Sequence, residues 1–146
     1  MRYGASAGFV GTNKEGVLAN NLFKLSHYYS NHHYLKVSKQ MLSNLKETAL
    51  NYGLSYSNWL QLMSNFSNEY FEIVISGKKA LSKLIELNKT YIPNKLIAGS
   101  LTKSELPLLK DRYDSSETFI YICAEGTCKL PEKEVSKVVS EIKLKF

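Results

Sequence analysis

The sequence of 146 residues lacks any long hydrophobic run. No apolar stretch approaches the roughly 20 residues that a helix needs to cross a bilayer. Residues 1–10 contain only Phe9-Val10 as an apolar step, whereas a secretory signal peptide requires a longer apolar region. We therefore expect a cytoplasmic protein without a membrane partner.

Cysteine is scarce, and Cys123 and Cys128 are the only two in the chain. Their spacing does not match the Cys-x-x-Cys motif of thioredoxins, and a zinc site needs four ligands. The pair could be a buried strand-end cysteine and a loop cysteine that both stay reduced, a local reversible disulfide, or part of a metal site. A disulfide requires the two Cα atoms to lie within about 7 Å of each other. We name Cys123 and Cys128 as a redox candidate, and we expect no metal and no cofactor.

Arginine is also scarce, because only Arg2 and Arg112 occur among the 19 basic residues. The net charge of +6 would permit contact with nucleic acid. However, arginine is the usual residue for bidentate contacts with phosphates and bases, and the lysines are spread through every segment. We therefore expect a solvated lysine-rich surface and no nucleic-acid partner.

The remaining composition, 44% hydrophobic and 22% charged, is typical of a globular protein. Residues 1–12 lack periodicity and are predicted to form a poorly ordered arm. Helical periodicity then covers residues 13–67 in three segments. The first has a stripe of Leu18, Leu22, Leu25 and Tyr29, the second runs from Tyr34 to Ala49, and the third from Tyr56 to Phe66. A helical hairpin followed by a third helix is predicted.

Residues 68–146 are predicted to form a small α/β domain. Strand-like runs at 70–75, 95–99 and 118–123 alternate with helical segments at 79–89 and 132–143. This alternation is typical of βαβ units. We expect a three-stranded parallel sheet in the order 2-1-3 with right-handed crossovers.

The three N-terminal helices carry more apolar surface than such a sheet can cover, because the sheet's own two helices compete for its faces. Each exposed Leu or Phe would forgo roughly 1.5–3 kcal/mol of burial. We therefore predict an interface that contacts either the missing part of a longer parent chain or a second copy in a homo-oligomer. Its candidate residues are Leu22, Tyr29, Met41 and Trp59.

The turn Ser76-Gly77-Lys78 follows the first predicted strand and precedes a helix. Backbone amides at such a turn can hold a phosphate. The Walker and dinucleotide-binding motifs both need further glycines that this turn lacks. The two hypotheses are an anion site at Ser76, Gly77 and Lys78, and a tight turn that binds nothing.

The other titratable residues suggest no catalytic group. No acidic residue at helical spacing supports His27 as a general base, and His32 and His33 adjoin each other in a polar break, where surface or capping roles are favoured. Carboxylates crowd the loops around the third strand, and we expect them to be solvated. They are Asp111, Asp114, Glu117 and Glu125.

Several short motifs follow one another along the chain. They are Asn21-Leu22-Phe23-Lys24-Leu25, Tyr56-Ser57-Asn58-Trp59, Ile73-Val74-Ile75-Ser76-Gly77, Tyr91-Ile92-Pro93-Asn94-Lys95, Leu106-Pro107-Leu108-Leu109, and Tyr121-Ile122-Cys123 with Cys128 and Pro131. Their order resembles the C-terminal part of the thioredoxin-domain-containing family, which includes spermatogenesis-associated thioredoxin-like proteins and bacterial YyaL-type proteins. The resemblance spans roughly Asn13 to the C-terminus. A departure lies at Thr12-Asn13-Lys14-Glu15-Gly16, where relatives read Pro-Ser-Gly-Asn-Ser.

The resemblance implies that residues 13–67 are the last hairpins of an α/α toroid similar to six-hairpin glycosidases, and that residues 68–146 are the closing α/β segment. The thioredoxin-like part and most of the toroid would lie outside this chain. We therefore expect a structural or interaction segment without catalysis of its own. The alternatives are a small thiol-redox module that uses Cys123 and Cys128, an anion or nucleotide binder at Gly77, or part of a carbohydrate-active, epimerase- or glycosidase-like enzyme.

Overall fold

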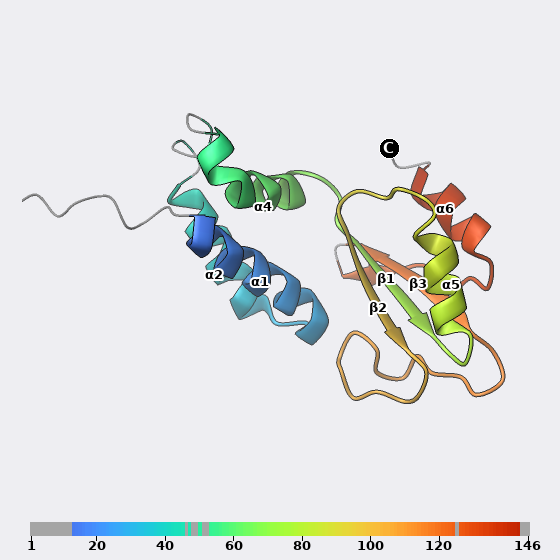
Figure 1. Cartoon of the computed structure of the whole chain (residues 1–146). Coiled ribbons are helices and arrows are strands. Elements are labelled where there is room, and N and C mark those ends of the chain that lie inside the picture. Colours follow the sequence, from blue (N-terminus) through green and yellow to red (C-terminus); the bar gives the residue numbers. More distant parts are fainter. Residues whose placement is uncertain (1–12, 46, 48–49, 51–52, 125, 144–146) are drawn as a thin grey trace, which may run out of the picture. The chain divides into compact units, whose positions relative to one another are not determined.

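The computed structural model of the chain describes residues 13–45, 47, 50, 53–124 and 126–143, and it is a mixed α/β protein (Figure 1). The predicted arm at residues 1–12 lies outside the described residues. The chain divides into two compact units with a boundary between Ser67 and Asn68, and His27–Ser30 group with the second unit.

The first unit is helical and contains α1 (Asn13–Tyr29) up to Ser26, α2 (His32–Ser43), the 3₁₀ helix η1 (Gly53–Tyr56) and α4 (Ser57–Ser67). Asn31 begins α2, because its side-chain oxygen accepts hydrogen bonds from the amides of His33 at 3.0 Å and Tyr34 at 3.2 Å. This is the usual way to satisfy free amides at a helix start. The predicted helical hairpin is therefore present in the first unit.

The face that α1 buries consists of small and polar residues around Phe23 rather than the predicted leucine stripe. Gly16 permits a close approach, since a Cβ atom there would lie 3.1 Å from the Trp59 ring. The Asn20 amide donates to the Asn58 carbonyl at 2.7 Å, and the Ser38 hydroxyl donates to the Ala19 carbonyl at 2.8 Å. Close packing with hydrogen bonds thus decides which face of α1 is buried.

The second unit contains a four-stranded mixed sheet with the strand order β2-β1-β3-β4. Its elements are β1 (Phe71–Ser76), α5 (Ala80–Leu87), β2 (Lys95–Ser100), β3 (Phe119–Ala124), β4 (Thr127–Cys128) and α6 (Val135–Lys143). Strand β1 pairs in parallel with β2 and antiparallel with β3, and β3 pairs antiparallel with β4.

The predicted order 2-1-3 of the first three strands is confirmed, but the prediction of a parallel three-stranded sheet is wrong. A parallel return needs a crossover that traverses the sheet, usually through a helix. Residues 101–118, all of which the structure describes, form turns and bends instead. The chain therefore starts β3 at the sheet end where β2 finishes, and β3 runs antiparallel. The two-residue β4 was not predicted, because it is too short to show periodicity.

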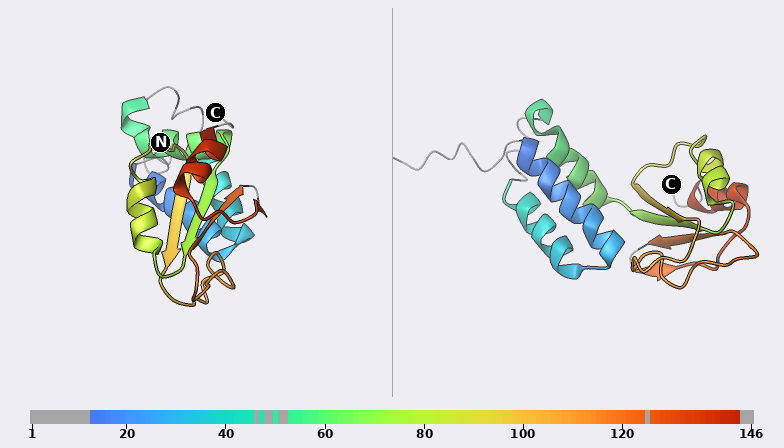
Figure 2. Two further views of the ribbon diagram at one scale, coloured as in Figure 1. Left: turned by 90° about the vertical axis from the view of Figure 1, so that its right-hand side faces the viewer. Right: turned by 60° about the horizontal axis from the view of Figure 1, so that its bottom comes forward.

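Helices α5 and α6 cover the same face of the sheet (Figure 2). The core between them includes Ile73, Ile120 and Val138, each of which is fully buried. Full burial of one such side chain contributes roughly 1.5–3 kcal/mol. On the other face, loop 101–118 contributes the buried residues Leu108 and Leu109. The loop thereby takes the place that the sequence analysis assigned to a second helix layer.

Candidate functional site

The two cysteines lie directly opposite each other on β3 and β4 and form a disulfide. The register pairs Cys123 with Cys128, and their Cα atoms are 3.9 Å apart. The structure thus contains the local disulfide, one of the three arrangements that the sequence left open. A redox role for the pair stays a prediction.

The two sulfur-bearing residues differ in exposure. Cys123 is 1% exposed within the sheet, whereas Cys128 is exposed on the short edge strand β4. A soluble thiol can therefore reach Cys128, while Cys123 is shielded by its neighbours. Thiol–disulfide exchange depends on which sulfur can be attacked, and the two cysteines differ in this respect.

Arg112 of loop 101–118 lies against both sulfur atoms. Its guanidinium donates from Nη1 to Cys123 Sγ and from Nη2 to Cys128 Sγ, each at 3.4 Å. The same group lies over the ring of Tyr121, with Cζ 5.0 Å from the ring centroid. Such cation–π contacts contribute about 0.5–1 kcal/mol at exposed sites. A permanently charged group is thus held next to the disulfide.

The local structure of the loop explains the position of Arg112. Its amide donates to the Leu109 carbonyl at 3.3 Å, and Asp111 adopts a left-handed conformation with φ of 59°. The Arg112 carbonyl accepts a hydrogen bond from the Tyr121 hydroxyl at 3.4 Å. Tyr121 and Cys123 are two residues apart on β3, so both side chains point to the same face of the sheet. The loop backbone and this face together direct the guanidinium onto the sulfur atoms.

Arg112 was not predicted as a site residue. Its type suggested only contacts with phosphates and bases, and it lies 11 residues before Cys123 in the chain. The antiparallel return of the chain into β3 brings the two residues together. A signal did exist, because Arg112 is one of only two arginines in the chain.

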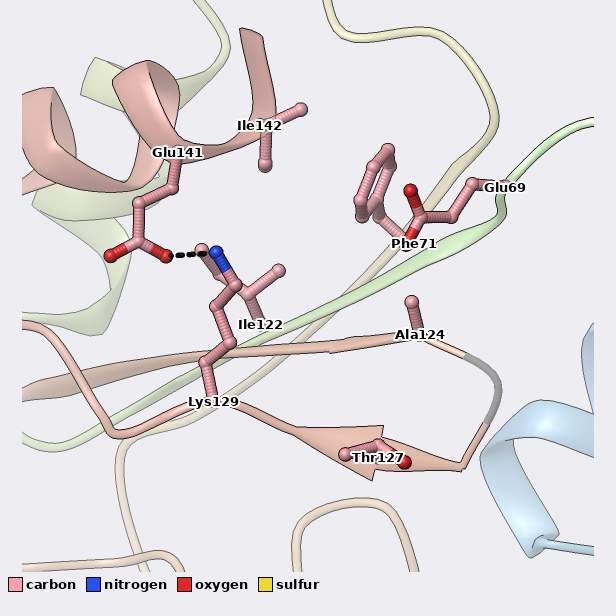
Figure 3. A pocket seen from close by; sticks show the side chains of 8 residues that line it. All are labelled: Glu69, Phe71, Ile122, Ala124, Thr127, Lys129, Glu141 and Ile142. Carbon is pink, nitrogen blue, oxygen red and sulfur yellow. Dashed lines mark hydrogen bonds and ion pairs between the residues drawn. The ribbon is translucent and has the colours of Figure 1, made fainter. Parts of the chain in front are cut away.

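A cavity of about 330 Å³ lies against the other face of the same hairpin (Figure 3). Its walls include Phe71, Ile122 and Thr127 from the strands and Ile142 from α6. An ion pair joins Lys129 Nζ to Glu141 Oε2 over 3.0 Å across this region (Figure 3). The hairpin therefore carries the disulfide on one face and a cavity wall on the other.

Comparisons of the chain with family models, with curated proteins and with solved structures find no match. The resemblance to the thioredoxin-domain-containing family is therefore a hypothesis that depends on the motifs quoted above.

The anion-site candidate Ser76-Gly77-Lys78 forms a tight turn that is hydrogen-bonded to neighbouring segments. The Gly77 amide donates to the Ser100 carbonyl at 3.0 Å, and the Lys79 amide donates to the Thr118 hydroxyl at 3.0 Å. Ser76 is buried. The turn is thus bonded to neighbouring segments, and anion binding there stays a prediction.

Among the titratable candidates, His27 has an acidic neighbour that helical spacing could not indicate. Both His27 and Glu72 belong to the second unit, and His27 Nδ1 lies 2.6 Å from Glu72 Oε1. His33 contributes its amide to the Asn31 cap, and His32 is exposed at the start of α2. In the part of the chain that the structure describes, no cluster of His, Cys, Asp or Glu could hold a metal ion.

Asp114 accepts three hydrogen bonds within its loop, from the Ser116 hydroxyl at 2.6 Å, the Ser116 amide at 2.7 Å and the Glu117 amide at 3.0 Å. These bonds, the one from the Ser116 hydroxyl most of all, lower the pKa of the Asp114 carboxyl. Asp114 is half-buried, and its carboxylate stabilises the conformation of its own loop.

The four interface candidates differ in exposure. Trp59 is 1% exposed and packs against Gly16, so it is a core residue and does not lie on an open surface. Leu22 and Met41 are half-buried, and Tyr29 is exposed.

Within the described residues, no helix is long and apolar enough to cross a bilayer.

Proposed function

We propose that the second unit is a thiol-redox module whose working group is the Cys123–Cys128 disulfide. The observation that carries this proposal is the pairing of a buried and an exposed cysteine across a two-residue edge strand. Strand β4 is short, so little of the sheet has to move when the sulfur atoms separate. The partner is a soluble dithiol, or a protein that carries one.

The exchange proceeds in two displacements. A thiolate of the dithiol attacks Cys128 Sγ, a new sulfur–sulfur bond forms there, and the Cys123–Cys128 bond breaks with its electron pair on Cys123 Sγ. The second thiolate of the dithiol then displaces Cys128 Sγ and closes its own disulfide. Two electrons and two protons have passed to the protein, and the reverse sequence oxidises a dithiol.

The test is a titration of the folded protein with dithiothreitol at neutral pH, followed by alkylation and mass spectrometry. We expect both thiols to appear together while the circular dichroism spectrum stays folded, and to disappear again when the reductant is removed. The proposal is overturned if the disulfide stays intact in the folded protein and is reduced only after denaturation.

Two single-cysteine variants serve as matched controls. Cys123→Ser leaves the exposed Cys128, and Cys128→Ser leaves the buried Cys123. Since reactivity follows access to the sulfur, Cys128 in the first variant should be alkylated faster than Cys123 in the second. Equal rates would contradict the assignment of Cys128 as the attacked sulfur.

A second candidate function is self-association of the chain through α1. Four large hydrophobic side chains of this helix are exposed, namely Val17 at 46%, Leu18 at 53%, Leu25 at 39% and Tyr29 at 53%. Leu18, Leu25 and Tyr29 recur at helical spacing and share one face. An apolar stripe is complementary to itself, as a two-fold dimer interface requires. The occupant that we propose is therefore a second copy of this chain.

Light scattering at a series of protein concentrations tests the dimer. We expect the mass of the wild-type protein to rise toward that of a dimer, and we expect Leu18→Glu with Leu25→Glu to weaken association by about a hundredfold or more, because each buried leucine contributes roughly 1.5–3 kcal/mol. Lys24→Glu, on an exposed position of the same helix, is the control and should still dimerise. A wild-type protein that is monomeric at every concentration would refute this candidate.

A further inference from the structure

Arg112 contacts both atoms of the bond that the redox proposal requires to break. Its two terminal nitrogens lie 3.4 Å from Cys123 Sγ and 3.4 Å from Cys128 Sγ. A neutral disulfide sulfur is a weak acceptor, so the oxidised state uses little of the donor capacity of the guanidinium. The two guanidinium nitrogens are thus placed to stabilise a negative charge that forms on sulfur only when the Cys123–Cys128 bond breaks.

We propose that Arg112 is a catalytic residue of thiol–disulfide exchange that stabilises the Cys123 thiolate as it leaves. This inference rests on the proposed redox function. When the external thiolate bonds to Cys128 Sγ, the electron pair of the broken bond stays on Cys123 Sγ, next to Nη1. Arginine stays protonated at all relevant pH values, so it stabilises the anion without transferring a proton to it.

The positive charge of Arg112 stabilises a thiolate at Cys123 more than a thiolate at Cys128, because the two sulfur atoms lie in different environments. Cys123 is almost fully buried, whereas a thiolate at the exposed Cys128 is hydrated by water. Interactions between charges are stronger and less screened when the groups are shielded from solvent. Without Arg112, a buried thiolate would be costly to form, since burial disfavours the charged form.

The other ionisable groups that face Cys123 from the described elements are few. Glu72 of β1 is its register partner, and His27 Nδ1 holds the Glu72 carboxyl at 2.6 Å. Tyr121 precedes it on the same face of β3 and supports the guanidinium through its ring. The negative charge of Glu72 opposes the thiolate, so the net preference for the anion depends on Arg112.

The test compares wild-type protein with Arg112→Gln and Arg112→Met, which both remove the charge, while the methionine keeps an apolar stem over the Tyr121 ring. We measure the rate of reduction by dithiothreitol and, in the Cys128→Ser background, the ultraviolet absorbance of the Cys123 thiolate against pH. We expect both variants to slow reduction by about tenfold, because a less stable thiolate leaves more slowly. We also expect the absorbance midpoint to rise by about one pH unit or more.

Two further variants separate charge from structure. Arg112→Lys keeps the positive charge, and its pH profile should stay close to that of the wild-type protein. Lys110→Gln removes a charge from the same loop, where Lys110 faces Glu105 at 3.9 Å, and it should change neither the rate nor the midpoint. Thermal unfolding of each variant shows whether the fold is kept.

The outcomes distinguish this inference from the redox function on which it rests. If the wild-type disulfide does not exchange in the folded state, the redox function itself fails. If it exchanges and both neutral variants keep the wild-type rate and midpoint, only the role of Arg112 is overturned. If Arg112→Lys shows the same loss as the neutral variants, shape rather than charge is responsible, and the proposed role is again overturned.

Discussion

At the residue scale, Tyr70 shows how burial at the start of β1 changes the acidity of a side chain. Burial, with smaller contributions from Tyr28 and Glu72, raises the pKa of Tyr70 to about 12. The ordinary pKa of tyrosine is about 10, so the folded state holds the phenolic proton more tightly than the unfolded chain. This contribution to stability is fully present below about pH 10 and is lost as the pH rises toward about 12.

We therefore predict that Tyr70→Phe loses less unfolding free energy than the wild-type protein between about pH 10 and about pH 12. The measurement is urea denaturation at a series of alkaline pH values. Tyr91→Phe is the control, because Tyr91 is 86% exposed, and its curve should follow that of the wild-type protein. Parallel curves for the wild-type protein and Tyr70→Phe would contradict the prediction.

The residue scale is also where prediction from sequence was weakest. Arg112 and Cys123 are brought together by the return of the chain into β3, and no local pattern encodes that contact. The same holds for Glu72, which lies beside His27 although 45 residues separate them. Pairings of this kind depend on the direction of strands and on loop geometry, which composition and spacing do not contain.

At the scale of elements, the turn between β1 and α5 depends on Gly77. Its φ is +131°, a conformation that side chains disfavour, and a Cβ atom there would lie 2.7 Å from Thr118 Cα. The turn thus fits directly against the segment that starts β3. The requirement for glycine follows from close backbone approach and does not need a bound phosphate.

We predict that Gly77→Ala destabilises the protein by about 2–3 kcal/mol or more, because strain in φ and a steric clash add together. Denaturant unfolding measures the change. Gly99→Ala on β2 is a matched control, since its Cβ would lie 3.4 Å from the Ile75 carbonyl oxygen without a disfavoured φ. Equal effects of the two substitutions would show that the turn relaxes around the new methyl group.

The positions of the strands were predictable to within one or two residues, because β-branched and aromatic runs mark β1, β2 and β3 clearly. The direction of β3 was not predictable from its own residues, since Phe119–Ala124 would suit either pairing. It was decided by residues 101–118, which lack a helix that could carry the chain back across the sheet.

At the scale of the whole molecule, the sequence indicated the mixed α/β class. It also predicted more apolar surface on the three N-terminal helices than the sheet can cover, and it named Trp59, which is buried, among the interface candidates. An apolar stripe shows that a helix has a face to bury, but not which of its faces a neighbouring helix will cover. In α1 that choice depends on Gly16 and Ala19, whose small size allows close contact. Glycine and alanine contribute little to a hydrophobic pattern, so the periodicity of the sequence did not predict that this face is buried.

The bridge between β3 and β4 spans a sequence separation of 5 residues. A covalent link that closes so small a ring removes less freedom from the unfolded polypeptide than one that joins distant segments. The buried apolar layer under α5 and α6 stabilises the second unit independently of this link. We therefore expect the architecture of the second unit to be kept when this one bond is reduced.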